Sequence, residues 1–442
     1  MSTCARPDKK DLHRAAVCQL PLLAEAKAGD TMTMRGLLMD QILTRSATAR
    51  DADARRLAGG ALAAALRDSR HRTLSLLDDL SDEQWRMPHQ VGVNLVAWEL
   101  AHLAWFGEFW ILRGPHHVDD AGFVHAARPA RIAGPDSLFD SARLDHTSRW
   151  QVELPSRNRV IQMLLEQLEA CLEVLPDSTD DADLYFHRLT LFHEDMHGEA
   201  FAWMRASLGY PAPAGVHLPA VGQRFSVSVP AGCVQVGSST HSGFAFDNEL
   251  PCSHVELNAF EIDSDPVSAG EFLGFVDAGG YENPAYWPGE AGLWLARQAR
   301  RHPERWRHMS AGWEVRWFDR WPALQPGLPV IHLNAFEAEA FCLYAGRRLP
   351  TATEWQAAAM LSASRGFHWG HSVWEWTAST FLPYDGFRPG PYKDYSAPWF
   401  GNHRELRGGA FATHARMHTP HYRNFFMPHR ADIFAGFRTA AG

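Results

Sequence analysis

The sequence predicts an α+β chain of two domains, an N-terminal helical bundle and a C-terminal domain of short strands, helices and loops. Between residues 53 and 208, apolar residues recur every three or four positions in four long stretches, the spacing of helices that bury one face. From about residue 220 the chain turns to short runs of β-forming residues broken by Pro and Gly. We therefore expect a leader over residues 1–54, the bundle over 55–212 and the second domain over 220–442.

Composition and charge narrow the class of protein. With 46% apolar and 21% charged residues, the chain has the balance of an ordinary globular protein. The net charge of −9, without a basic run, argues against nucleic acid as a partner. No apolar stretch reaches the roughly 18 residues that span a membrane, and the polar N-terminus does not lead into a secretory signal. The six cysteines form no C-x-x-C pair, so we expect reduced thiols in a cytoplasmic protein without a membrane partner.

Four helices are predicted for the bundle, and their ends carry recognisable signals. The helices are expected over residues 53–80, 94–112, 157–175 and 181–208. Ser81 with Gln84 has the spacing of a capping box that begins one more short helix, and Gly209 followed by Pro211 ends the last long helix. The stretch 94–112 is apolar nearly all round, which predicts a buried helix. The leader is weakly patterned, with one short helix expected over residues 34–44.

The fourth helix carries His193 and His197 in the motif His-Glu-Asp-Met-His. Four residues are about one helical turn, so both imidazoles project from one face and can bind one transition metal. The second helix holds His102 at its middle, and facing helices of a bundle build metal sites from inward side chains. Glu194 and Glu199 are the expected hydrogen-bond acceptors behind the imidazoles. The alternative is that the three histidines are core residues of a non-catalytic binding protein.

The same motif also matches H-E-x-x-H, the signature of zinc proteases. Those enzymes take a third ligand downstream, either a glutamate about 20 residues on or a histidine in H-x-x-G-x-x-H. After Glu199 the next glutamate is Glu249, and His217, near the expected distance, lies in a linker rich in Pro and Ala. A zinc hydrolase is therefore a distant alternative.

In the second domain the expected elements are short. Strands are expected within residues 225–236 and 254–262, and helices over 268–278 and 334–345. Beyond residue 369, loops and short strands should prevail, which makes this an α+β domain of low regular content.

A series of motifs runs through the second domain. These are Pro230–Ser238, Asp247–Pro251, Gly346–Trp355, Val373–Thr377, Leu406–Phe411, Tyr422–Phe426 and Phe434–Arg438. In this order they resemble the formylglycine-generating-enzyme (sulfatase-modifying-factor) fold, a C-type-lectin-like domain. The first half is similar to a DinB-like four-helix bundle. The combination resembles the ergothioneine, ovothiol and selenoneine synthase family, non-heme iron(II) enzymes that use O2 to bond sulfur or selenium to a histidine-derived imidazole.

The resemblance implies Fe(2+) as cofactor, O2 as co-substrate and hercynine, a quaternary ammonium compound, as substrate. It places the iron on His102, His193 and His197. The residues it implies at the substrates are Met196, Trp399, Asn424, Phe425, Phe426, Arg430 and, for the donor, Arg149. Since aromatic faces hold quaternary ammonium groups, the candidates for that role are Phe425, Phe426, Trp399 and Trp105. One of Tyr384, Tyr392 and Tyr395 would be the proton donor.

Two positions depart from the pattern of relatives that use γ-glutamylcysteine. Met196 stands where those relatives have glutamine, and Phe426 stands where they have an acidic residue. The lost acid argues against γ-glutamylcysteine, a zwitterionic donor that an acid and an arginine would hold. Phe-Phe also occurs in the cysteine-using branch, so Phe426 alone does not choose the donor. The whole pattern is most similar to the selenoneine-synthase branch, in which a selenosugar is the donor. The alternative is an ergothioneine-type synthase that joins hercynine to cysteine or γ-glutamylcysteine.

Formylglycine generation itself is disfavoured by the positions of the cysteines. That chemistry relies on a cysteine pair in the C-terminal domain. Of the cysteines after residue 220 (Cys233, Cys252 and Cys342), none falls in the closing segment 406–438.

Overall fold

The computed structural model describes residues 54–240, 243–361 and 366–441. These residues belong to one compact unit. The predicted leader, apart from its last residue, and the helix expected over residues 34–44 lie outside the described part of the chain.

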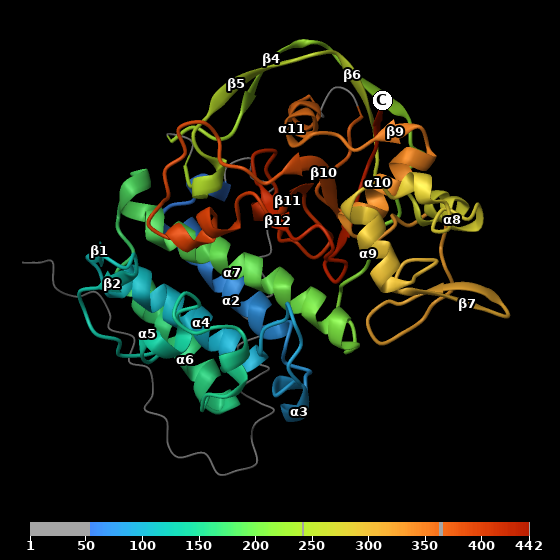
Figure 1. The fold of residues 1–442 in the computed structure, drawn as a ribbon. Coiled ribbons are helices and arrows are strands. Elements are labelled where there is room, and N and C mark those ends of the chain that lie inside the picture. The colour runs from blue at the N-terminus through green and yellow to red at the C-terminus, as the bar shows by residue number, and fades with distance from the viewer. Residues whose placement is uncertain (1–53, 241–242, 362–365, 442) are drawn as a thin grey trace, which may run out of the picture. The chain divides into compact units, whose positions relative to one another are not determined.

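The first half is helical, as predicted. Its long helices are α2 (Gly59–Ser75), α4 (Val96–Gly107), α6 (Arg157–Glu173) and α7 (Asp181–Leu208). Its shorter elements are η2 (Ala54–Arg56), α3 (Asp82–Trp85), η3 (Glu108–Leu112), β1 (His116–Val118), β2 (Val124–Ala126), α5 (Asp136–Phe139) and η4 (Thr147–Trp150). Helix α2 packs on α6 and α7, and α4 packs on the same two helices, which closes the bundle (Figure 1).

The ends of the helices show why they form where the sequence predicts. Ser81 and Gln84 form the expected capping box at the start of α3. Asp180 accepts a hydrogen bond from the amide of Ala182 at the start of α7. Gly209 ends α7 with a φ of 70°, a left-handed conformation that glycine adopts without steric cost. Helix α4 is buried along almost its whole length, as its apolar sequence predicts.

The second half mixes short strands and helices, which confirms the predicted α+β fold class. One four-stranded sheet has the order β12-β11-β10-β13, another has the order β3-β6-β14-β9, and hairpins form from β4 with β5 and from β7 with β8. The strands are β3 (Ser226–Val229), β4 (Gly232–Val236), β5 (Ser253–Leu257), β6 (Phe260–Asp263), β7 (Trp306–Met309), β8 (Gly312–Val315), β9 (Arg347–Arg348), β10 (Trp374–Thr380), β11 (Arg404–Gly408), β12 (Asn424–Phe426), β13 (Ala435–Gly436) and β14 (Ala440–Ala441). Each of the two strand runs expected from sequence holds two strands.

The helices of this half are α8 (Ala269–Asp277), α9 (Glu290–Gln298), α10 (Ala335–Tyr344) and α11 (Ala352–Met360). Short 3-10 turns are η5 (Asp247–Glu249), η6 (Pro284–Tyr286), η7 (Lys393–Tyr395), η8 (Ala397–Trp399) and η9 (Ala415–Met417). The expected helices correspond to α8 and α10, whereas α9 and α11 were not expected. Helix α11 begins at a capping box of Thr351 and Glu354, a signal that lies inside one of the family motifs.

Helix α7 joins the two halves, and Figure 1 shows it running between the bundle helices and strands β10 to β12. Phe192 on α7 stacks on Phe244 of the second half, with ring centroids 5.0 Å apart. Buried residues of both halves belong to one continuous hydrophobic core. Among the described residues, helices are either too short or too polar to cross a membrane.

Candidate metal centre and substrate pocket

Three histidines from two helices meet in the bundle. Helix α4 supplies His102, and α7 supplies His193 and His197. One ring nitrogen from each lies within 4.8 Å of the others, and in the described part of the chain this is the one such group of potential metal ligands. The ring centroids of His102 lie 5.2 Å from His193 and 5.4 Å from His197, and those of His193 and His197 are 4.5 Å apart. The pair spaced by one turn and the third histidine therefore converge as the sequence predicts.

The orientation of His102 is fixed by the last residue of α5. Its Nδ1 lies 2.7 Å from the carbonyl oxygen of Phe139. Because a carbonyl oxygen only accepts, Nδ1 carries the proton and the lone pair of Nε2 is left for another partner. The ring stacks on Trp98, with centroids 5.1 Å apart. Burial lowers the pKa of His102 to about 3, so this imidazole is neutral at physiological pH.

His197 is oriented by a carboxylate. Its Nδ1 lies 2.5 Å from Oε1 of Glu99, a residue on α4 that is 2% exposed. The carboxylate accepts the Nδ1 proton, which again leaves Nε2 free. Sequence reasoning missed Glu99. The available signal is an acidic residue within an otherwise apolar helix, three positions before His102 and therefore one turn away.

His193 is held by packing. Its ring lies flat on Phe106, with centroids 3.6 Å apart and planes 3° apart. Its Nε2 is buried and has no hydrogen-bond partner among the described residues. Such an unsatisfied group costs about 1–3 kcal/mol, which a bound metal would offset. Burial holds the pKa of His193 well below its ordinary value, so it too is in the neutral form that binds metals.

Glu194 and Glu199 do not contact the imidazoles, and their predicted role is wrong. Glu194 is turned toward α2, where Arg70 donates to it at 2.7 and 3.0 Å. Glu199 is turned toward the second half and accepts hydrogen bonds from Trp374 and Thr413, each at 2.6 Å. Each glutamate follows a ligand histidine by one or two positions and therefore faces away from it. Glu194 also lies one turn before His197, but its ion pair with Arg70 holds it away from that ring.

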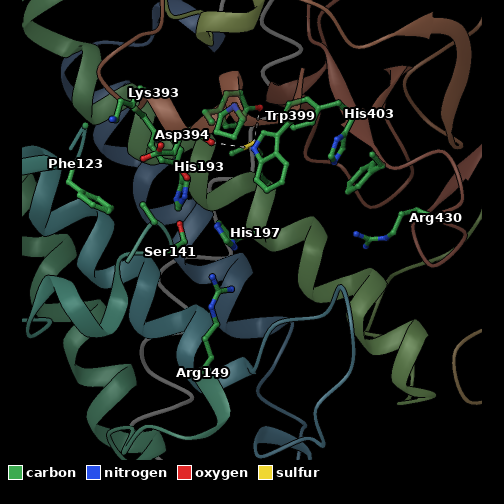
Figure 2. A pocket seen from close by; sticks show the side chains of 18 of the residues that line it. Phe123, Ser141, Arg149, His193, His197, Lys393, Asp394, Trp399, His403 and Arg430 are labelled. Atoms are coloured by element: carbon green, nitrogen blue, oxygen red, sulfur yellow. Dashed lines mark hydrogen bonds between the residues drawn. The ribbon is translucent and has the colours of Figure 1, made fainter. Parts of the chain in front are cut away.

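A pocket of about 680 Å³ opens beside His193 and His197, lined by both halves of the chain (Figure 2). Of the residues predicted to contact substrates or supply a proton, the lining includes Arg149, Met196, Tyr392, Tyr395, Trp399, Phe425, Phe426 and Arg430. Strand β12 presents Phe425 and Phe426 because it pairs with β11, opposite Glu405 and Arg404. Residues scattered over some 300 positions thus share one cavity with the histidines.

Three predicted residues lie outside the lining. Tyr384 accepts a hydrogen bond from Arg407 at 3.1 Å, and its ring is covered by the guanidinium of Arg423. Asn424 uses its side-chain oxygen to accept from the amide of Phe425 at 2.9 Å. Trp105 donates to Asp136 at 2.8 Å. Each of these side chains is committed to the protein's own structure, so the structure does not bring them to the pocket.

Two tyrosines face the pocket in different settings. The ring of Tyr392 lies 5.8 Å from that of His193 and 5.0 Å from that of Phe106. The hydroxyl of Tyr395 donates to the sulfur of Met196 at 3.3 Å and lies 3.3 Å from the hydroxyl of Tyr422. Burial raises the pKa of both tyrosines above the ordinary value, so both phenols hold their protons.

Two arginines border the pocket, and each is held by neighbours. The guanidinium of Arg149 lies 3.7 Å above the ring of Trp98, and its Nη1 donates to Asn94 at 2.5 Å. Figure 2 shows Arg149 pointing toward His197. Arg430 forms a two-pronged ion pair with Asp432, with both contacts at 2.6 Å. Asp432 was not expected from sequence, although it lies two residues from Arg430.

The rest of the lining could not be predicted from any pattern. It includes Phe123, Ser141, Lys393, Asp394 and His403. Phe123 precedes β2, at the turn of the β1–β2 hairpin, and Lys393 and Asp394 belong to η7. These are loop positions whose approach depends on how the two halves pack, which local sequence does not encode.

Comparison with known proteins identifies both halves. Residues 65–204 match the DinB superfamily, and residues 219–373 match the sulfatase-modifying factor enzyme 1-like domain. The hercynine oxygenase of Mycolicibacterium thermoresistibile is 30% identical over 439 residues, which cover 86% of this chain and 94% of that protein. The hercynine oxygenase of Mycobacterium tuberculosis is 30% identical over 427 residues, covering 86% and 98%.

A third relative matches only the second half. The formylglycine-generating enzyme of Streptomyces coelicolor is 26% identical over 271 residues, which cover 47% of this chain and 84% of that enzyme. The hercynine oxygenases, in contrast, align with both halves along almost their whole length. This confirms the predicted two-domain fold and the prediction of an oxidoreductase. The chain belongs to the hercynine oxygenase family.

Proposed function

We propose that the protein is a non-heme iron(II) enzyme that uses O2 to join a chalcogen donor to the imidazole C2 of hercynine. The observation that carries this proposal is the convergence of His102, His193 and His197, of which His193 and His197 line a pocket shared by the two halves of the chain. The relatives named for hercynine and oxygenation support the substrate and the reaction class.

The residues present fit iron. Hydrogen bonds at Nδ1 leave Nε2 of His102 and His197 free, and Nε2 of His193 is buried without a partner. Three imidazole ligands with the remaining positions open suit a non-heme Fe(II) site. Bound iron and O2 would supply the oxidising power, and the protein supplies orientation, a proton and exclusion of water.

Hercynine would be held by its two charged groups, a quaternary ammonium and a carboxylate on the same carbon. Its quaternary ammonium cannot donate a hydrogen bond, so aromatic faces must hold it, and Phe425, Phe426 and Trp399 line the pocket. Its carboxylate needs a cation. Arg149, which the resemblance implied for the donor, points toward His197 from the pocket wall, and we propose it for the hercynine carboxylate instead. A direct contact of Asn424 with hercynine stays a prediction.

We assign the proton donor to Tyr392. Both Tyr392 and Tyr395 line the pocket. The hydroxyl of Tyr395 is engaged with Met196 and Tyr422, whereas that of Tyr392 is hydrogen-bonded to Ser141, itself a residue of the lining. Tyr392 packs edge-on against His193, which puts its phenol beside the metal ligands. A phenol whose pKa is raised by burial stays protonated until a reacting group draws its proton away.

The donor we propose is a selenosugar, with cysteine or γ-glutamylcysteine as the alternative. Arg430 is the pocket arginine that would hold a donor carboxylate, and Asp432 already neutralises its charge. Beside it, Phe426 offers an apolar face, and Trp399 is 42% exposed. A neutral sugar needs no carboxylate clamp, whereas the carboxylate of a zwitterionic donor would have to compete with Asp432 for Arg430 or bind elsewhere in the lining, as at Lys393.

A competition assay tests the proposal. The protein is loaded with Fe(II) without oxygen, then given O2, hercynine and equal concentrations of the selenosugar, cysteine and γ-glutamylcysteine, and the products are identified by mass spectrometry. We expect the carbon–selenium product to dominate. Dominance of a carbon–sulfur product would replace the donor but keep the reaction. Absence of any hercynine product, or activity with Zn(II) that needs no O2, would overturn the proposal.

A further inference from the structure

We propose that Glu99 is a positioning residue that acts on the metal centre through His197, and this inference rests on the proposed function. Its carboxylate lies 2.5 Å from Nδ1 of His197, on the side of the ring away from the nitrogen left for the metal. Glu99 would therefore influence the metal without binding it.

The three ligand histidines differ in the group that holds each imidazole ring in place. His102 donates to a backbone carbonyl, that of Phe139, and His193 is placed by its contact with the Phe106 ring. In the described part of the chain, His197 alone of the three is hydrogen-bonded to a charged group. The site therefore has one imidazole that is more electron-rich than the other two, since a carboxylate on the Nδ1 proton raises the basicity of Nε2.

The burial of Glu99 indicates that its contact with His197 is not incidental. The side chain is 2% exposed and sits on α4, whose neighbouring positions Trp98 and Leu100 are also buried. Burying a carboxylate is costly unless it is paired and hydrogen-bonded. Its hydrogen-bond partner is His197, and its charge also acts on Arg149 at the pocket wall. A divalent ion on the far side of the imidazole would compensate that buried charge.

Two consequences follow for the loaded enzyme. The ring of His197 is held in one tautomer and one orientation, so Nε2 is presented to the metal before binding. The buried negative charge also favours the more highly charged state of a metal, so it should lower the Fe(III)/Fe(II) potential. Loss of the charge should therefore weaken metal binding and raise the potential together.

Three variants separate these effects from simple loss of packing. Glu99→Gln keeps the size and an oxygen that can accept, but removes the charge. Glu99→Asp keeps the charge but shortens the side chain by one methylene, which moves the carboxylate away from His197. Glu199→Gln is the matched control, because Glu199 is also buried and lies two residues from His197, yet bonds Trp374 and Thr413 instead.

The test is an anaerobic Fe(II) titration against a competing chelator, with the midpoint potential measured on each loaded protein. We expect Glu99→Gln to raise the Kd for Fe(II) about 10- to 100-fold and to raise the potential. Glu99→Asp should recover part of both, and Glu199→Gln should stay within about threefold of the wild type. If Glu99→Gln does not fold, the same comparison is made with Glu99→Asp against Glu199→Gln.

The outcomes distinguish this inference from the function on which it rests. If the wild type binds Fe(II) and the Glu99 variants bind it equally well at an unchanged potential, the role of Glu99 is overturned while the iron site stands. If the wild type binds no Fe(II), the proposed function fails and the role of Glu99 fails with it. A Glu99 variant that loses thermal stability but keeps its Kd and potential would show a structural role only, which also overturns the inference.

Discussion

The indole N–H of Trp374 donates to the carboxylate of Glu199 at 2.6 Å, which connects β10 of the second half to the helix that carries His193 and His197. The other oxygen of Glu199 accepts from Thr413, also at 2.6 Å. Both Trp374 and Glu199 are buried. This contact ties the helix of the metal ligands to the domain that supplies the opposite wall of the pocket.

Trp374→Phe should therefore destabilise the protein. The variant leaves one oxygen of a buried carboxylate without its donor, at a cost of about 1–3 kcal/mol in the free energy of unfolding. Urea denaturation of the metal-free protein measures this. Trp399→Phe is the control, since its indole bonds a backbone carbonyl at an exposed position, and it should change the value by less than about 0.5 kcal/mol. Equal effects of the two variants would contradict the importance of the contact.

Tyr392→Phe should lower turnover without changing iron content. A positioned proton donor contributes about 10²- to 10⁴-fold to a rate, and phenylalanine keeps the ring that packs on His193. Tyr384→Phe is the control and should remain near the wild-type rate, because that hydroxyl contacts Arg407 outside the pocket. Rates of hercynine consumption at saturating O2 measure both. A Tyr392→Phe enzyme with full turnover would move the role to Tyr395.

Asp432→Asn should change the preference among donors. The variant frees the guanidinium of Arg430 from its ion pair, so a donor carboxylate can bind it. A charge-assisted hydrogen bond is worth about 1.5–3 kcal/mol, so KM for γ-glutamylcysteine should fall about tenfold or more while that for the selenosugar stays constant. Asp394→Asn, which removes an acid that lines the pocket, tests for a general charge effect. An equal change in KM for both donors would show that Arg430 does not discriminate between them.

Stability should fall below neutral pH because buried histidines resist protonation. Burial lowers the pKa of His418 to about 3, at a site away from the pocket. The unfolded chain takes up this proton near pH 6.5, whereas the folded chain does so only near pH 3. The stabilising contribution is thus complete above pH 6.5 and is lost as the pH falls toward 3.

His418→Asn should make this pH dependence shallower. Between pH 7.5 and 5 the free energy of unfolding of the wild type should lose about 2 kcal/mol more than that of the variant. Urea denaturation of the metal-free proteins at both pH values measures this difference. Any change in the free energy of unfolding that the substitution causes equally at both pH values cancels. Equal losses would show that His418 is protonated in the folded protein.

Much of the bundle could be predicted because its signals are local. The apolar period placed the ends of the long helices to within about six residues, and the spacing of His193 and His197 put both on one face of α7. His102 was found because the pair on α7 lacked a third ligand and the resemblance to a known family placed one there. The resemblance to a known family added Met196, Phe425 and Arg430, which periodicity alone does not mark.

What failed from sequence depends on contacts between distant segments. Glu194 and Glu199 were expected to support the imidazoles because they are adjacent in sequence, but adjacency on a helix turns side chains apart, and Glu99 on another helix takes that place. The ion pair of Arg430 with Asp432 and the hydrogen bond of Tyr384 with Arg407 likewise depend on side-chain rotamers in the packed protein. Helix α9 and helix α11 were overlooked because short helices carry too few turns for a clear period.

The iron content of single histidine variants tests the central claim most directly. After anaerobic loading and desalting, the wild type should retain about one iron per chain, and His102→Ala, His193→Ala and His197→Ala should each retain less than about a tenth of that. His217→Ala is the control, since a zinc-protease arrangement would need that histidine and the three-histidine site does not. Full iron content in any of the three variants, or its loss in His217→Ala, would contradict the assignment of the site.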